Sequence, residues 1–234
     1  MFYQHSINQV KGAIFLQSLF GNRRRTYDAD SIRRADLFGQ GDNSQQDTLN
    51  LDHPEEQAPR EIMFDMESGS YLEVGQNGRK SYFTLNGFER TIASPGHNTP
   101  MTIMGTDGAN RIETGDGNDY IQGRGGHDAL LGHGGNDVIQ GGSGNDWITG
   151  GTGVNHVYGG AGRDTFAMTE GQGSFDIVKD FEDGVDKLWI RSAGNLRVVD
   201  GHSDAYVLRN NDLLAVVQGA AGDLEIGAGG ITVI

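Results

Sequence analysis

A large apolar residue recurs at every ninth position along the middle of the chain. Residues 105–167 divide into seven consecutive nine-residue units with no gap, and the apolar residue is always the eighth of its unit. The last three residues of each unit are expected to form a short strand whose middle side chain points inward. The seven inward residues are Ile112, Ile121, Leu130, Ile139, Ile148, Val157 and Phe166.

The first six residues of each unit are expected to form a turn that can hold a cation. The fourth position is glycine in all seven units, and glycine allows a positive φ and a close approach of backbone carbonyls. The sixth position carries an aspartate or asparagine, so a side-chain oxygen ends the turn. Oxygen-only ligands suit calcium better than zinc. The sixth-position residues are Asn110, Asp119, Asp128, Asp137, Asp146, Asn155 and Asp164.

A unit of this kind should not fold without an ion. Ordering nine residues costs far more conformational entropy than the burial of one aliphatic side chain returns. Stacked carboxylates also repel one another. A divalent cation between them reverses the sign of that interaction, which couples binding to folding.

Composition and charge remove several classes of protein. The 234-residue chain has 38 glycines and no cysteine, which excludes a disulfide scaffold and a thiolate metal site. With 32 acidic and 18 basic residues its net charge is −14, so nucleic acid is not expected as a partner. No apolar run is long enough for a transmembrane helix.

The repeat region resembles a known calcium-binding family. The units GGSGNDWIT (141–149) and GGAGRDTFA (159–167) match the pattern G-G-x-G-x-D-x-U-x, with U a large apolar residue, at every fixed position. This pattern is that of the RTX (repeats-in-toxin) nonapeptide family. The resemblance implies an all-β fold, a parallel β-roll (a right-handed β-solenoid), with two repeats per coil and calcium held between repeats n and n+2.

The same resemblance implies about five calcium sites. Three pair aspartates, Asp119 with Asp137, Asp128 with Asp146 and Asp146 with Asp164, and two weaker ones pair Asn110 with Asp128 and Asp137 with Asn155. Carbonyl groups of the glycine-rich turns would complete each ligand shell. The turn glycines implied are Gly117, Gly126, Gly132, Gly135, Gly141, Gly144 and Gly162.

Both flanks resemble parts of related proteins. Residues 175–190 are similar to the segment that follows the repeats, and closes the roll, in serralysin-type proteases and alginate epimerase R modules. Residues 41–51, 61–69 and 84–89 are similar to the degenerate coil that precedes them. The predicted division is therefore an N-terminal helix and Arg-rich arm (1–35), a degenerate solenoid cap (36–104), the β-roll (105–167), and a C-terminal cap with a candidate secretion signal (168–234).

The two ends of the chain carry further predictions. A capping box at Ser6–Gln9 and helical spacing of apolar residues predict a short N-terminal helix over 6–20. The arginines between 23 and 34 are read as a solvated linker or a patch that neutralises the acidic surface, with a membrane-surface or partner-docking helix and then nucleic acid as alternatives. Strands are expected at 195–199, 205–209 and 213–218, with a turn at 210–212.

No catalytic arrangement is recognised, so the chain is not expected to be an enzyme. The H-E-x-x-H motif, the G-x-S-x-G elbow and a phosphate loop are all absent, and there is no cysteine nucleophile. Outward positions of the even-numbered units could stack on sugar rings, although contact with a cap or a partner chain is the favoured interpretation. These positions are Tyr120, Gln122, Val138, Gln140, His156 and Tyr158.

The sequence therefore predicts a calcium-binding, secreted or cell-surface protein that folds on calcium and acts as a structural or binding module. The resemblance implies export by an ABC-type exporter without an N-terminal signal peptide. One alternative is the C-terminal targeting or folding module of a secreted protease or polysaccharide-modifying enzyme. Another is a surface adhesion or assembly component that docks polysaccharide or a partner protein through the Tyr/Gln face or the N-terminal helix.

Overall fold

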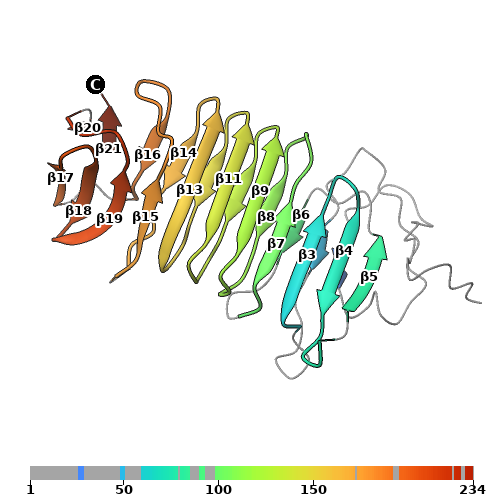
Figure 1. Cartoon of the computed structure of the whole chain (residues 1–234). Helices are drawn as coiled ribbons and strands as arrows, with labels where there is room; N and C mark the ends of the chain where they lie inside the picture. Colours follow the sequence, from blue (N-terminus) through green and yellow to red (C-terminus); the bar gives the residue numbers. More distant parts are fainter. Residues whose placement is uncertain are drawn as a thin grey trace, which may run out of the picture.

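The chain folds into an elongated stack of β-strands (Figure 1). The computed structural model describes residues 26–28, 48–50, 59–78, 80–84, 90–92, 98–171, 173–191, 195–222, 224–227 and 230–233. All regular secondary structure in these residues is β, which confirms the predicted all-β class. The predicted helix over 6–20 and most of the Arg-rich arm lie outside them. The described residues contain no helix long and apolar enough to cross a membrane.

The repeat strands alternate between two parallel sheets. Strands of the odd-numbered repeats pair with one another in register, as in Ile112↔Leu130 and Leu130↔Ile148. Those of the even-numbered repeats do the same in the second sheet, as in Ile121↔Ile139. One coil therefore contains two repeats, and the predicted parallel β-roll is confirmed. The odd-repeat sheet contains β8 (Arg111–Glu113), β10 (Ala129–Leu131), β12 (Trp147–Thr149) and β14 (Thr165–Ala167), and the even-repeat sheet β9 (Tyr120–Gly125), β11 (Val138–Ser143) and β13 (Val154–Ala161).

The core of the roll consists of the predicted apolar ladders. All seven eighth-position side chains are at most 1% exposed. The residues on either side of them point outward and are mostly half-buried. The odd-repeat strands have three residues as predicted, whereas the even-repeat strands run on into the following turn. Because each repeat buries one large apolar residue, the core is thin and depends on contacts between coils.

The N-terminal side continues the same two sheets. β7 pairs with β9 as Thr102↔Tyr120, and β3 pairs in parallel with β7. β4 and β5 then add antiparallel strands to the edge of β3. The side chains of Ile62, Phe64 and Ile103 extend the core into this region. The strands are β1 (Thr26–Asp28), β2 (Thr48–Asn50), β3 (Glu61–Asp65), β4 (Ser70–Val74), β5 (Lys80–Thr84), β6 (Arg90–Ile92) and β7 (Met101–Met104).

The C-terminal side ends the roll with antiparallel strands (Figure 1). β15 and β16 add one more parallel strand to each sheet, and the following strands close the stack, which protects an otherwise open sheet edge. The predicted strands near 196, 205 and 213 are confirmed, and Asn210 and Asn211 form the tight turn with φ of 50° and 71°. The strands are β15 (Phe175–Val178), β16 (Lys187–Trp189), β17 (Leu196–Asp200), β18 (Ala205–Arg209), β19 (Asp212–Val217), β20 (Leu224–Gly227) and β21 (Gly230–Val233).

Candidate metal centre

The sixth-position side chains of the repeats form two columns, one along each edge of the roll. In each column the backbone N–H of one sixth-position residue donates to Oδ1 of the residue 18 positions later. Asp119 donates to Asp137 at 2.9 Å, Asp128 to Asp146 at 2.8 Å, and Asp146 to Asp164 at 2.8 Å. The parallel register therefore brings together every pair of aspartates that the sequence predicted as calcium ligands.

The second carboxylate oxygen of these aspartates has no hydrogen-bond partner. Each Oδ2 is buried, and the five residues are at most 3% exposed. Buried polar atoms in folded proteins are nearly always paired, and an unpaired buried charge is costly. Five such oxygens in a regular array form the kind of donor set that a cation can bind. They belong to Asp119, Asp128, Asp137, Asp146 and Asp164.

The electrostatics of the columns point the same way. Burial raises the pKa of Asp128 to about 7, and the Asp146 charge adds to the effect. Burial raises the pKa of Asp137 to about 8, and the charges of Asp119, Asp176 and Asp116 raise it further. Near neutral pH these carboxylates therefore either retain a proton or carry an unfavourable charge. A bound divalent cation would favour the ionised form instead.

The first-position glycines let a carboxylate and a carbonyl oxygen meet. A Cβ on Gly123 would lie within 3.0 Å of both Asp128 Oδ2 and Gly141 O. The same holds at Gly132, where Asp137 Oδ2 and Gly150 O meet. We call such a space, bounded by one unpartnered carboxylate oxygen and one carbonyl oxygen, an oxygen cradle. Gly141 bounds a third cradle, with Asp146 Oδ2 and Gly159 O.

The fourth-position glycines bring further carbonyls into the stack. Gly144 has a φ of 133°, and a Cβ there would lie within 3.0 Å of Gly126 O one coil earlier. Only glycine tolerates both the conformation and the contact. Gly117 differs, since it has no positive φ and instead approaches Thr99 O. The glycines that share the Gly144 arrangement are Gly126, Gly135, Gly153 and Gly162.

This donor set suits calcium. Calcium takes 6–8 oxygen ligands, carboxylate and carbonyl alike. The described part of the chain contains no cluster of three or more His, Cys, Asp or Glu side chains that could hold an ion by themselves. Backbone carbonyls must therefore supply much of each shell, as the glycine-rich turns allow.

The two asparagines in the columns behave differently from the aspartates. Asn110 Oδ1 accepts a hydrogen bond from Thr106 N at 2.7 Å. Asn155 Oδ1 accepts one from Asp137 N at 3.0 Å, and its Nδ2 donates to Asp176 Oδ1 at 2.8 Å. Protein groups thus satisfy the side-chain oxygens at both positions.

The structure adds two carboxylates that the sequence reasoning missed. Asp176 is 2% exposed and follows Asn155 by 21 residues, and Asp186 Oδ1 accepts a hydrogen bond from Asp164 N, 22 residues earlier, at 2.9 Å. Both lie beyond the last repeat and extend the columns by one position. The 18-residue spacing could not find them, because the connecting turns are longer there.

The repeat region matches a known family of calcium-binding repeats. A family model of the RTX calcium-binding nonapeptide repeat, which spans four copies, matches residues 104–139 and 131–166. No curated protein matches the chain significantly. Among solved structures, the solution structure of the AlgE6R3 subunit from the Azotobacter vinelandii mannuronan C5-epimerase is 23% identical over 60% of this chain and 67% of that one, with a TM-score of 0.18. The stretch from 104 to 166, which forms most of both carboxylate columns, therefore consists of RTX calcium-binding nonapeptide repeats.

Proposed function

We propose that this chain is a calcium-dependent folding module that works outside the cell as a structural or binding element, without catalytic activity of its own. The observation that carries the proposal is the array of five buried carboxylate oxygens without a hydrogen-bond partner. These oxygens oppose folding when no cation is present and favour it when one binds.

The coupling follows from the energetics of the columns. Any ligand that binds the folded chain and not the unfolded one stabilises the fold in proportion to its concentration. The oxygen cradles exist only when neighbouring coils are stacked, so calcium can bind them only in the folded roll. In calcium-poor cytoplasm the repeats would stay unfolded and ready for export, and calcium outside the cell would fold them.

The ligands proposed for calcium are the column aspartates together with turn carbonyls. Asp128 with Asp146, and Asp146 with Asp164, lie along one edge, and Asp119 with Asp137 along the other. Extracellular calcium modules bind with dissociation constants of roughly 10⁻⁴–10⁻³ M, and the repeated sites of this chain should fall near that range.

Far-UV circular dichroism tests the proposal directly. The purified chain is placed in excess EGTA and titrated with calcium, and a parallel sample receives magnesium. We expect a cooperative gain of β signal with calcium alone, because magnesium demands a tighter octahedral shell and keeps its waters. An unchanged β spectrum in EGTA and in calcium would refute calcium-coupled folding.

Export can be tested separately. The proposal is that an ABC-type exporter recognises the chain and that no N-terminal peptide is removed. The chain recovered from the medium of cells carrying such an exporter should therefore retain its original N-terminal sequence. Recovery only with an N-terminal segment cleaved would refute this route.

A second candidate function, surface adhesion, is favoured by an exposed aromatic pair. Trp147 and Trp189 are 43% and 37% exposed, and their ring centroids lie 5.5 Å apart on the odd-repeat sheet. On the even-repeat sheet, the Tyr120 hydroxyl donates to Gln140 Oε1 at 3.2 Å. Tryptophan fluorescence of the calcium-loaded chain, titrated with purified surface polysaccharide, tests binding at the tryptophan pair on the odd-repeat sheet. No spectral change, or an equal change in Trp147→Ala, would argue against adhesion through this face.

A further inference from the structure

The seven repeats are not equivalent, because the second repeat fills its own cradle. Threonine stands at position 114, the first position of its repeat, where all six other repeats have glycine. The Thr114 hydroxyl donates to Gly132 O at 3.1 Å and lies beside the Asp119 carboxylate. In the other cradles the carbonyl that corresponds to Gly132 O faces an unpartnered carboxylate oxygen with no side chain between them. The Thr114 hydroxyl thus takes the carbonyl oxygen that a cation would use at this position, while Asp119 Oδ2 stays without a hydrogen-bond partner.

The sixth repeat is closed in another way. The Asn155 amide donates to Asp176 Oδ1, and a Cβ on Gly150 would lie within 3.0 Å of both Asn155 Nδ2 and Asp176 Oδ1. Asn155 is fully buried and Asp176 nearly so. The carboxylate oxygen that faces Gly150 therefore has a donor, whereas the Oδ2 atoms in the neighbouring repeats have none.

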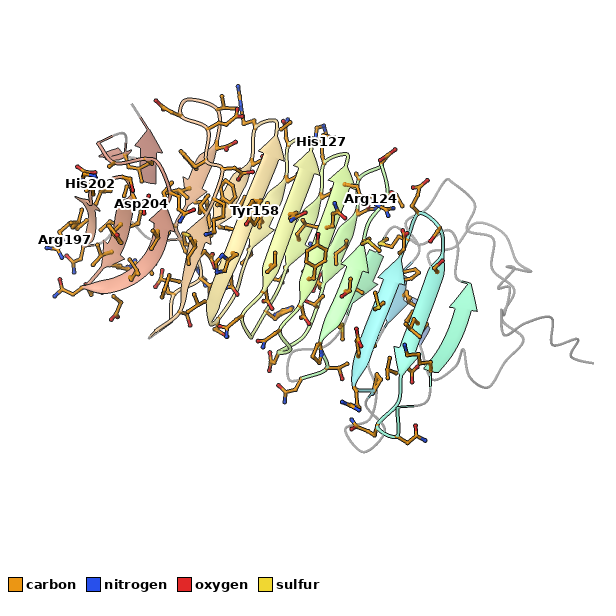
Figure 2. All side chains as sticks on the ribbon, in the orientation of Figure 1. Arg124, His127, Tyr158, Arg197, His202 and Asp204 are labelled. Carbon is orange, nitrogen blue, oxygen red and sulfur yellow. The ribbon has the colours of Figure 1, made fainter. Side chains whose placement is uncertain are left out.

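At the N-terminal end of the odd-repeat column, an arginine supplies a positive charge. Arg124 stands at the second position of the third repeat with a φ of 75°, a conformation that non-glycine residues rarely adopt. Its Nη1 donates to Gly105 O at 2.8 Å and lies 2.9 Å from Asp65 Oδ1. Figure 2 shows Arg124 where the repeat coils meet the β3–β5 end of the stack. In later coils the carbonyl equivalent to Gly105 O lines a cradle.

We propose that this chain closes three positions of its calcium array with its own donors, Thr114, Asn155 and Arg124, and leaves three cradles for calcium. This inference rests on the proposed function and narrows its ligand set, because Thr114 closes the position between Asp119 and Asp137. Two open cradles follow one another along the odd-repeat edge, at Asp128 and Asp146, and one lies alone on the even-repeat edge, at Asp137. Asp164 Oδ2 has no cradle of this kind, since the space at Gly159 meets the Phe166 ring in place of a carbonyl oxygen.

The arrangement has a consequence for folding. Donor-closed positions join neighbouring coils without an ion, and two of them lie in the first coils of the array, next to β3 and β7. These coils can therefore stack before calcium binds and provide a template for the next ones. Calcium would then load mainly along the odd-repeat edge.

Calcium stoichiometry tests the inference, since restoring the repeat pattern should create sites. Equilibrium dialysis at saturating calcium should give three ions for the wild-type chain, and four each for Thr114→Gly and Asn155→Asp. Two control variants make the same chemical changes on exposed turn residues outside the cradles, Thr152→Gly and Asn136→Asp. Both should bind three ions.

Each outcome separates this inference from the proposed function. A gain of one ion in either restored variant, with no gain in its control, supports the inference. A wild-type chain that binds four or more ions overturns it even if a variant fails to fold. Folded variants that gain no ion, while the wild type binds calcium, overturn it and leave the proposed function intact. A wild-type chain that binds no calcium refutes both.

Discussion

Replacing Asp137 by asparagine should change stability in opposite directions with and without calcium. Asp137 is fully buried, its Oδ1 accepts a hydrogen bond from Asp119 N at 2.9 Å, and its Oδ2 has no partner. Asparagine has the same shape and keeps Oδ1. Its amide would replace the unpartnered oxygen with a donor that faces Gly150 O, as Asn155 does toward Asp176.

The magnitude follows from the raised pKa. Burial raises the pKa of Asp137 from 3.8 to about 8, so its contribution to stability is present below pH 3.8 and is lost as the pH rises toward 8. At pH 7 that loss amounts to about 4 kcal/mol. Asp137→Asn removes it, and should stabilise the calcium-free fold by up to this amount. With calcium at 100 times its dissociation constant, loss of one ion should instead destabilise the chain by about 3 kcal/mol.

Two experiments, one of folding and one of unfolding, measure this change in the sign of the effect on stability. In EGTA, folding is driven by the osmolyte TMAO and followed by circular dichroism, and Asp137→Asn should need less TMAO than the wild type. In calcium, urea unfolding should show the variant to be less stable. Asp107→Asn, which removes an exposed carboxylate from the third position of a repeat, is the matched control and should change neither midpoint appreciably. A variant destabilised equally in both conditions would refute the reasoning.

Three further predictions concern the same columns. Asp146→Ala should raise the calcium midpoint of folding more than Asp164→Ala, because Asp146 lies between two column neighbours within the repeats. Gly141→Ala should bind one calcium ion fewer in equilibrium dialysis, since its Cβ would fall within 3.0 Å of two cradle oxygens. Gly108→Ala, whose Cβ would have its nearest atom at 3.6 Å, should bind as many ions as the wild type. Calcium affinity measured by calorimetry should fall between pH 8 and pH 6, because carboxylates such as Asp128, whose pKa burial raises to about 7, must lose a proton to bind calcium.

Each of these predictions has an outcome that contradicts it. Equal calcium midpoints for the two aspartate variants would show that Asp146 does not contribute to the two calcium sites that the stacking register predicts for it. Full calcium binding by Gly141→Ala would show that the first-position glycine is not needed for the cradle. An affinity that stays constant between pH 8 and pH 6 would mean that the column carboxylates are already ionised in the metal-free chain.

Local pattern was enough to predict the body of the roll. The apolar residue at the eighth position of each unit and the glycine and aspartate of each turn act within nine residues of chain, so the strand, the turn and the ligand chemistry could all be predicted from the sequence. The burial of Ile121, Ile139 and Val157 and the parallel register confirm the predicted ladder and coil. The antiparallel turn at Asn210 and Asn211 was likewise local.

Tertiary structure decided which positions of the array lack a donor. Asp176 and Asp186 enter the columns after intervals of 21 and 22 residues, and Asp65 reaches Arg124 from β3, so no fixed period identifies them. Thr114 and Asn155 look like minor departures from the repeat, and only the stacked coils show that each one donates to a cradle oxygen. The sequence determines the chemistry of one repeat because that chemistry is local, whereas the pairing of an oxygen with a donor or an ion depends on which residues the neighbouring coil places beside it.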